Sequence, residues 1–246
     1  MTVAKFIRID RRLFLARLGK GALALAVLGA CGDDALTATT SAGDTTTTAT
    51  GDQASYLRVN LGFVSAYLVI RGQEAAVVDT GVSGSEGAIE AALGAAELTW
   101  AEVAHVILTH HHPDHVGSIN AVMEASDATG YIGEADLDNV NSPRDLVAVK
   151  DGDAVFGLQV IHTPGHTAGH ISLLDPSAGV LVAGDAINGA NGGVVGPDQE
   201  FSEDHTQALA SVGKLVGYDY ETIYFGHGEP VLAGGSALVT QLLRDY

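Results

Sequence analysis

The chain has 246 residues and a formal net charge of −18 at pH 7, because 30 acidic residues stand against 12 basic ones. From residue 53 onward the imbalance is stronger, with six Lys or Arg against 25 Asp or Glu, a formal charge of −19. Nucleic-acid binding needs the opposite sign, so nucleic acid is excluded as an expected partner. From Tyr56 onward roughly 190 residues remain, enough for a single catalytic domain with a sizeable core.

The first 31 residues have the layout of a signal peptide. A basic start and the pair Arg11-Arg12, followed by Phe-Leu, precede an apolar stretch over residues 21–30. The arginine pair resembles a twin-arginine export signal, although Asp10 stands where Ser or Thr is more usual. The apolar run is too short to cross a bilayer, which takes about 20 residues.

The single cysteine, Cys31, ends that apolar run in the sequence Leu-Gly-Ala-Cys. This resembles a bacterial lipobox and predicts a lipid anchor on Cys31, against the plainer alternative of a thiol inside a cleaved signal. Residues 32–53 are mostly Thr, Ala, Gly and Asp and predict a flexible tether. We therefore expect an exported protein, lipid-anchored at a bacterial or archaeal cell surface or in the periplasm.

Strand and helix signals alternate over residues 54–246, the predicted catalytic domain. Mixed strands and helices of this kind predict two sheets covered by helices. Strands are expected at 56–60, 63–70, 75–79, 103–108, 129–132, 154–162, 170–174, 180–184 and 222–225, and helices at 83–97, 115–125, 203–216 and 235–244.

The most informative segment is residues 110–115, which hold four of the ten histidines of the chain and one aspartate. Imidazole and carboxylate are the usual protein ligands for zinc and iron. The segment follows an apolar stretch, 103–108, that is rich in β-branched residues and predicts a buried strand. A cluster this dense at a strand end indicates a metal site.

The alternation of an extended chain separates these histidines. His110 and His112 should face one side and His111 the other. Asp114 and His115 then open the predicted helix, so two ligands from the strand end and two from the helix start can converge. Four ligands are too many for a single catalytic zinc that keeps a water position, so the spacing suggests two metals.

Further candidate ligands follow other predicted strands. His166 lies in a Gly/Pro turn after one strand, Asp185 ends an apolar strand, and His227 stands between two glycines after the last strand. Asp79 ends an early strand in the same way. Neighbouring glycines leave room for a close approach at these positions.

This ordered set of motifs, with H-x-H-x-D-H at residues 110–115, resembles the metallo-β-lactamase superfamily over about residues 56–246. The resemblance implies an α/β fold, a four-layer αββα sandwich with the site along one sheet edge. It also implies two divalent metal ions, with zinc expected and iron the alternative, and a buried Asp79 that holds the metal loop without touching metal. The implied ligands are His110, His112 and His166 for the first metal, Asp114, His115 and His227 for the second, and Asp185 for both.

The remaining histidines are expected to have other roles. His105 and His205 are predicted to be surface or packed residues, and His162 to be structural because it lies in the strand alternation. His111 should point away from the metals. The role of His170 stays open between support of the site and simple packing.

The resemblance implies hydrolysis by a hydroxide held between two metals, which lower the pKa of bound water. An ester, lactone, thioester or amide of a small molecule would be attacked at its carbonyl, with positive charge stabilising the oxyanion. Asp114 would orient the nucleophile and carry its proton to the leaving group. The sequence contains no G-x-S-x-G motif for a serine nucleophile.

Further sequence features bear on the substrate. Only 19 residues follow His227, so the helical C-terminal region of glyoxalase II is not expected. Asn188 stands where homoserine-lactone lactonases carry a tyrosine, and Asp185 is kept where true β-lactamases generally replace it, so a β-lactamase is less expected. The loop 188–197 either lines the substrate pocket or is a flexible surface loop.

Two alternatives to the hydrolase remain. Persulfide dioxygenases resemble this pattern but use one iron, bound by residues matching His110, His166 and Asp185. A ligand-binding surface lipoprotein without catalysis is the other, and the intact ligand set argues against it.

Overall fold

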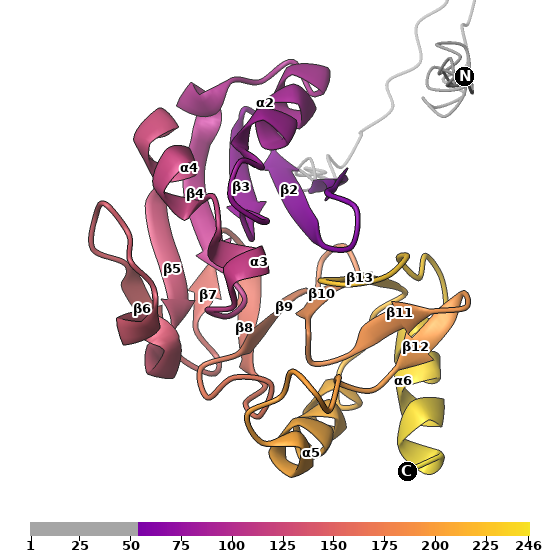
Figure 1. Ribbon diagram of the computed structural model, residues 1–246. Helices are drawn as coiled ribbons and strands as arrows, with labels where there is room; N and C mark the ends of the chain where they lie inside the picture. Colours follow the sequence, from indigo (N-terminus) through magenta and orange to yellow (C-terminus); the bar gives the residue numbers. More distant parts are fainter. Residues whose placement is uncertain (1–53) are drawn as a thin grey trace, which may run out of the picture. The chain divides into compact units, whose positions relative to one another are not determined.

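The structure is a computed structural model that describes residues 54–246 (Figure 1). The predicted signal peptide, the lipid anchor at Cys31 and the tether over 32–53 lie outside the described residues. Among the helices of residues 54–246, none is long and apolar enough to cross a membrane.

The first sheet has six strands in the order β1-β2-β3-β4-β5-β6. The first three form antiparallel pairs, and β3 to β6 run parallel. Parallel neighbours place their C-terminal ends on one edge, which brings the segments after β3, β4 and β5 together. The strands are β1 (Ser55–Asn60), β2 (Ser65–Arg71), β3 (Glu74–Val78), β4 (Val103–Leu108), β5 (Thr129–Gly133) and β6 (Val147–Val149).

The second sheet has the order β13-β10-β9-β8-β7. Only the β10–β13 pair is parallel, so these two strands also end on the same edge. A separate two-stranded ribbon, β11–β12, follows β10. The strands are β7 (Ala154–Val155), β8 (Leu158–His162), β9 (Ile171–Asp175), β10 (Val180–Gly184), β11 (Asn188–Ala190), β12 (Gly193–Val195) and β13 (Thr222–Phe225).

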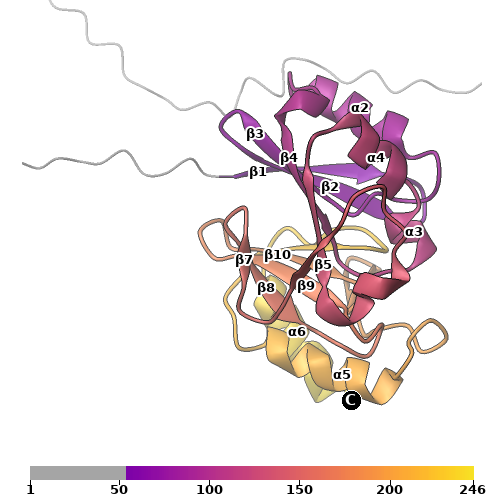
Figure 2. The same cartoon turned by 90° about the vertical axis from the view of Figure 1, so that its left-hand side faces the viewer.

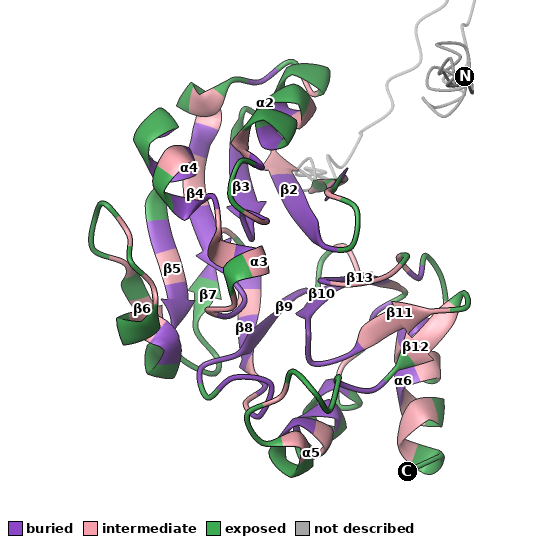
Figure 3. Ribbon diagram, viewed as in Figure 1, coloured by how far each residue is buried: buried purple, intermediate pink, exposed green. Residues whose placement is uncertain are grey.

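The layers are helix, sheet, sheet and helix (Figure 2). Side chains such as Tyr67 and Ile107 from the first sheet pack against Leu173 and Val182 from the second, and other buried clusters fill the space under the helices. Strands covered on both faces need to be apolar throughout, and β2, β3, β9 and β10 are accordingly buried along most of their length, whereas the edge strands β1 and β6 and the β11–β12 ribbon are not (Figure 3). The helices are α2 (Glu86–Ala95), α3 (Pro113–Val116), α4 (Ile119–Ala125), α5 (His205–Leu215) and α6 (Gly235–Arg244). The predicted αββα sandwich is therefore confirmed.

Two predicted elements are divided in the structure. The expected strand 154–162 turns back on itself at Phe156 and Gly157, whose φ angles of 51° and 76° suit a tight hairpin turn. The expected helix 115–125 breaks at Gly117 and Ser118 into α3 and α4. A Cβ on Gly117 would overlap the backbone of residues 82–83, so a contact remote in sequence sets this break.

The short strands β6, β11 and β12 were not predicted. Two 3-10 helices, Trp100–Glu102 and Glu134–Asn139, were not predicted either. The remaining strands and helices lie within three residues of their predicted bounds.

Candidate metal centre

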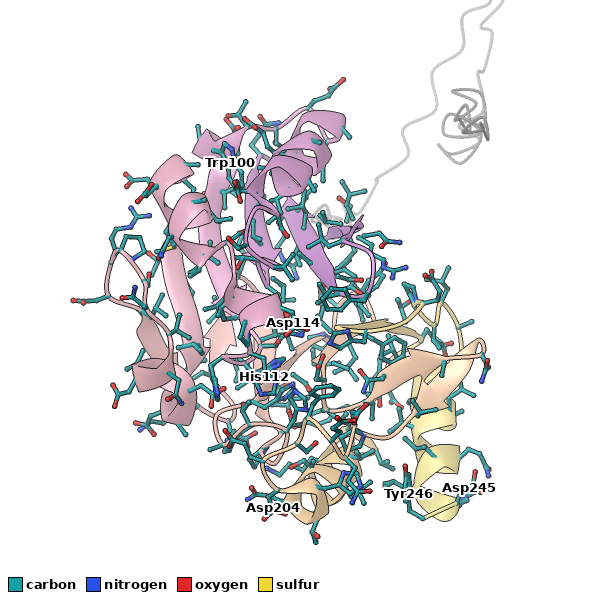
Figure 4. The ribbon with its side chains drawn as sticks, in the orientation of Figure 1. Trp100, His112, Asp114, Asp204, Asp245 and Tyr246 are labelled. Carbon is teal, nitrogen blue, oxygen red and sulfur yellow. The ribbon has the colours of Figure 1, made fainter. Side chains whose placement is uncertain are left out.

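Four strand ends deliver the predicted ligands to one place. His110 follows β4, His166 follows β8, Asp185 follows β10 directly and His227 follows β13. Figure 4 labels His112 and Asp114 near the centre of the view; Asp114 belongs to α3, and His112 immediately precedes that helix. All seven predicted ligands fall into groups whose donor atoms lie within 4.8 Å of one another.

The first group is His110, His112 and His166. The Nε2 atom of His166 lies 3.2 Å from His110 Nε2 and 3.0 Å from His112 Nδ1. A hydrogen bond can use only one donor and one acceptor, so three nitrogens facing one point cannot all be satisfied by each other. A cation at that point would satisfy all three.

The second group is Asp114, His115 and His227. The Oδ2 atom of Asp114 lies 3.3 Å from His227 Nε2 and 3.8 Å from His115 Nε2. Asp185 lies between the groups, with Oδ2 3.4 Å from His166 Nε2 and 3.1 Å from His227 Nε2. Its other oxygen, Oδ1, is 3.5 Å from His115 Nε2. We call the two groups the first and second triads. The Asp185 carboxylate faces both of them.

Three rings are oriented by a partner on their far nitrogen. His115 Nδ1 is 2.8 Å from Asp79 Oδ2, and His227 Nδ1 is 2.7 Å from the Phe63 carbonyl. Because these acceptors hold the proton on Nδ1, the Nε2 atoms are directed into the site. The buried Nε2 of His115 has no hydrogen-bond partner among the described residues. The donor set therefore fits a pair of divalent metal ions.

The third of these rings is that of His110, which is oriented by the Thr109 hydroxyl. Thr109 Oγ1 donates to Asp79 Oδ2 at 2.8 Å, so it must accept from His110 Nδ1, 3.1 Å away. Asp79 also accepts from the Thr109 amide at 2.8 Å. The expectation that Asp79 ties down the metal loop without entering the triads agrees with this geometry.

His170 supports Asp185 through a chain of hydrogen bonds. Of the two roles left open for His170 by the sequence, support of the site and simple packing, the structure favours the first. The Asp185 amide donates to His170 Nε2 at 2.9 Å, so the ring proton is on Nδ1, which faces Thr163 Oγ1 at 2.8 Å. Thr163 Oγ1 lies 3.1 Å from Ser172 Oγ, and Ser172 donates to the Ala183 carbonyl at 2.9 Å. The buried His170 therefore fixes the backbone that carries the shared carboxylate.

Asp136, fully buried, was missed by the sequence reasoning. It accepts from the His111 amide at 3.1 Å, from Thr167 Oγ1 at 2.6 Å and from the Gly169 amide at 2.6 Å. It thus joins the loop of His110 and His112 to the loop of His166. The signal was present, because Asp136 follows predicted strand 129–132 as Asp79 and Asp185 follow theirs.

Gly226 is required by close packing at the site. A Cβ there would overlap Asp185 Oδ1 and the ring of His115. The glycine beside His227 therefore has a steric reason, as the sequence pattern suggested.

The charges within the site are strongly coupled. Burial lowers the pKa of His166 to about 4. Burial also lowers the pKa of His115, but neighbouring carboxylates, Asp185 foremost, outweigh it and raise that pKa well above its usual value. Burial likewise lowers the pKa of His227, and hydrogen bonds to Asp114 and Asp185 raise it to about 10. Cations entering the site must displace the protons on these two rings, since imidazole ligates through a bare nitrogen.

The other histidines belong to neither triad. The His111 ring lies against Asp136, with Nδ1 3.1 Å from Oδ2. His105 packs against aromatic rings, His162 Nε2 is 3.0 Å from the Ala168 carbonyl, and His205 begins α5. These positions agree with the structural or surface roles predicted for them.

A cavity of about 890 Å³ opens over the two triads. Its walls come from the turn between β1 and β2, from the loop after β3, from the β11–β12 ribbon and from the segment before α5. The loop 188–197 contributes Asn188, Val195 and Gly196 to the lining. Of the two alternatives predicted for this loop, the structure agrees with the one that places it at the pocket. The full lining is Phe63, Val82, Ser83, His112, Pro113, Asp114, Gly117, His166, Asp185, Asn188, Val195, Gly196, Asp198, Phe201 and His227.

Comparisons with known proteins agree with this geometry. The family model of the metallo-beta-lactamase superfamily matches residues 59–227. A hydroxyacylglutathione hydrolase of Alkalilimnicola ehrlichii is 36% identical over 157 residues, which cover 62% of this chain and 56% of that enzyme. The chain therefore matches little more than half the length of this relative.

Solved structures show the same fold. A metallo-beta-lactamase family protein of Thermus thermophilus, TTHA1429, superposes with a TM-score of 0.63 at 24% identity, covering 78% of both chains. The protein TTHA1623, solved in a di-iron-bound form, gives a TM-score of 0.59 at 27% identity, covering 71% of this chain and 92% of that one.

Proposed function

Because the chain belongs to the metallo-beta-lactamase superfamily, we propose that it is a metal-dependent hydrolase that uses two divalent cations to cleave an ester, lactone, thioester or amide of a small molecule. The observation that carries this proposal is Asp185, whose two oxygens face both triads. In that position Asp185 would help to hold both cations. Zinc is the expected metal and iron the alternative, supported by the di-iron form of TTHA1623.

Bound cations would supply an ionised water and positive charge for a developing oxyanion. The side chains of the protein would orient the nucleophilic water and carry its proton. Asp114 lines the cavity, and burial raises its pKa while His227 and His115 outweigh that and lower it. Its carboxylate therefore stays ionised at neutral pH and is placed to orient a nucleophilic water and pass its proton to the leaving group.

A mononuclear-iron persulfide dioxygenase is the second candidate, because its expected ligands also converge. His166 Nε2 lies 3.2 Å from His110 Nε2 and 3.4 Å from Asp185 Oδ2. That activity gives no role to the second triad, in which His115 and His227 are held in place by dedicated partners. Because persulfide dioxygenases resemble the whole pattern, the number of metals bound, and not the presence of the second triad, decides between the two candidates.

Metal content separates the two candidates. We expect protein purified without added metal to contain close to two zinc or iron ions per chain. It should hydrolyse members of a panel of nitrophenyl esters, lactones, a hydroxyacylglutathione thioester and a β-lactam. One iron per chain, with oxygen uptake on glutathione persulfide and no turnover of any acyl compound, would replace the hydrolase by the dioxygenase.

We also propose, on the sequence alone, that the protein is exported and lipid-anchored at Cys31. Cys31→Ser is expected to move the protein from the membrane to the soluble fraction with unchanged thermal stability, because Cys31 precedes the tether. Mass spectrometry of the exported protein should find a lipidated Cys31 as its first residue. An exported protein that still begins at Met1 would refute the anchor.

A further inference from the structure

Exposed apolar side chains are concentrated at the mouth of the cavity. Residues 54–246 include eight large hydrophobic side chains that are exposed, and three of them line this cavity. Phe63 is 64% exposed, Phe201 62% and Val195 42%. An exposed phenylalanine is unfavourable in water, and two beside one cavity indicate a surface that a ligand covers.

Each of these side chains belongs to a segment that is hydrogen-bonded to a loop carrying one of the candidate metal ligands. The Phe63 ring stacks on the His227 ring at 6.0 Å and 10°, and the Phe63 carbonyl holds His227 Nδ1. The ribbon that ends at Val195 is held where the Gly189 amide donates to the His227 carbonyl at 3.0 Å. Two residues beyond Phe201, the Glu203 amide donates to the His166 carbonyl at 3.0 Å. Phe63, Val195 and Phe201, which we call the apolar wall, are thus held in fixed positions relative to the triads.

The charges that line the cavity disfavour an anionic substrate. Its described lining contains no Lys or Arg, and three of its residues are carboxylates, Asp114, Asp185 and Asp198. Three carboxylates nearly balance the charge of two divalent cations, so little positive charge is left to attract an anionic group. Arg58, on β1, is engaged by Glu229 at 2.7 Å and by the Gly228 carbonyl at 2.9 Å.

We propose that Phe63, Val195 and Phe201 form a subsite for an uncharged alkyl or aryl group next to the scissile carbonyl. The enzyme then prefers esters or lactones with an apolar arm over substrates that carry a carboxylate, including glutathione thioesters. This specificity rests on the proposed hydrolase function, whereas binding of an apolar group at the subsite does not.

Two ester series test the specificity. In one the acyl group grows from acetate to octanoate on 4-nitrophenol, and in the other the alcohol grows from ethyl to octyl on acetate. We expect kcat/KM to rise about tenfold or more in at least one series, since each buried methylene adds to transfer free energy. The 4-nitrophenyl hemisuccinate should be a poorer substrate than the butanoate, which has the same chain length without the carboxylate.

Calorimetry with 1-octanol tests the subsite without turnover. Octanol should bind the purified protein, and Phe201→Ala should weaken binding about fivefold or more by removing one aromatic wall. Leu232→Ala is the matched control, because Leu232 is 70% exposed but does not line the cavity. Phe201→Lys should raise kcat/KM for the hemisuccinate relative to the butanoate by supplying the missing cation.

The outcomes separate the two proposals. Octanol binding that depends on Phe201, with no turnover of any acyl compound, would support the subsite and refute the proposed hydrolase function. Turnover with no gain along either series, or with the hemisuccinate preferred, would overturn the subsite and leave the hydrolase. Equal loss of octanol binding in Phe201→Ala and Leu232→Ala would also overturn the subsite.

Discussion

Asp114→Asn is expected to lower kcat/KM about 100-fold or more while the protein retains part of its metal, in line with the loss of a general base. The asparagine keeps the shape of the side chain and one oxygen near His227 Nε2, which lies 3.3 Å from Asp114 Oδ2. It removes the negative charge and the capacity to accept a proton. The measurement is kcat/KM on the best ester of the panel, normalised to metal content.

Asp198→Asn provides the matched control. Asp198 also lines the cavity, but its Oδ1 accepts from the Glu200 amide at 2.8 Å and the residue belongs to neither triad. We expect this variant to change kcat/KM by less than about threefold. Equal losses in the two variants would assign the effect to the overall charge of the cavity, and full activity in Asp114→Asn would remove Asp114 from the mechanism.

The parts of the fold that were predictable are those set by local pattern. Buried strands such as 103–108 and 180–184 are indicated directly by their apolar, β-branched runs, and both were found with the predicted bounds. The candidate ligands followed because each stands just after a strand. The alternation of the extended chain also separated His111 from His110 and His112, as the structure shows.

The parts that were missed depend on contacts remote in sequence. The break between α3 and α4 is set by the backbone of residues 82–83, and Ser118 Oγ donates to the Val82 carbonyl at 2.7 Å. Asp136 joins two loops that are close only in the folded chain. The apolar wall of Phe63 and Phe201 forms because two loops meet at the cavity, which no local pattern indicates.

The supporting groups around the site explain why its rings are so closely arranged. Like-charged or unpaired polar groups brought together in a buried site destabilise a fold unless something compensates them. Asp79, His170 and Asp136 each hold a ligand-bearing segment through buried hydrogen bonds. The metal-free protein accordingly balances protonated rings against carboxylates, and metal binding should add to its stability.

The second large effect concerns the ligands themselves. His112→Ala and His227→Ala are each expected to lose metal and most activity, because one ring from each triad is removed. His112 Nδ1 lies 3.0 Å from His166 Nε2, and His227 Nε2 lies 3.1 Å from Asp185 Oδ2. Metal per chain after dialysis against a weak chelator, and the thermal midpoint with and without added zinc, are the measurements. The zinc-dependent rise in the midpoint should shrink in both variants.

His111→Ala and His205→Ala are the matched controls for these substitutions. Each removes an imidazole that belongs to neither triad, because the His111 ring faces Asp136 and His205 begins α5. Both should keep close to the full metal content. In His111→Ala the backbone amide that bonds to Asp136 is unchanged. Loss of metal in His111→Ala with full retention in His112→Ala would put the metal on the opposite face of the loop. That result would contradict both the alternation deduced from the sequence and the convergence of nitrogens on which the metal centre rests.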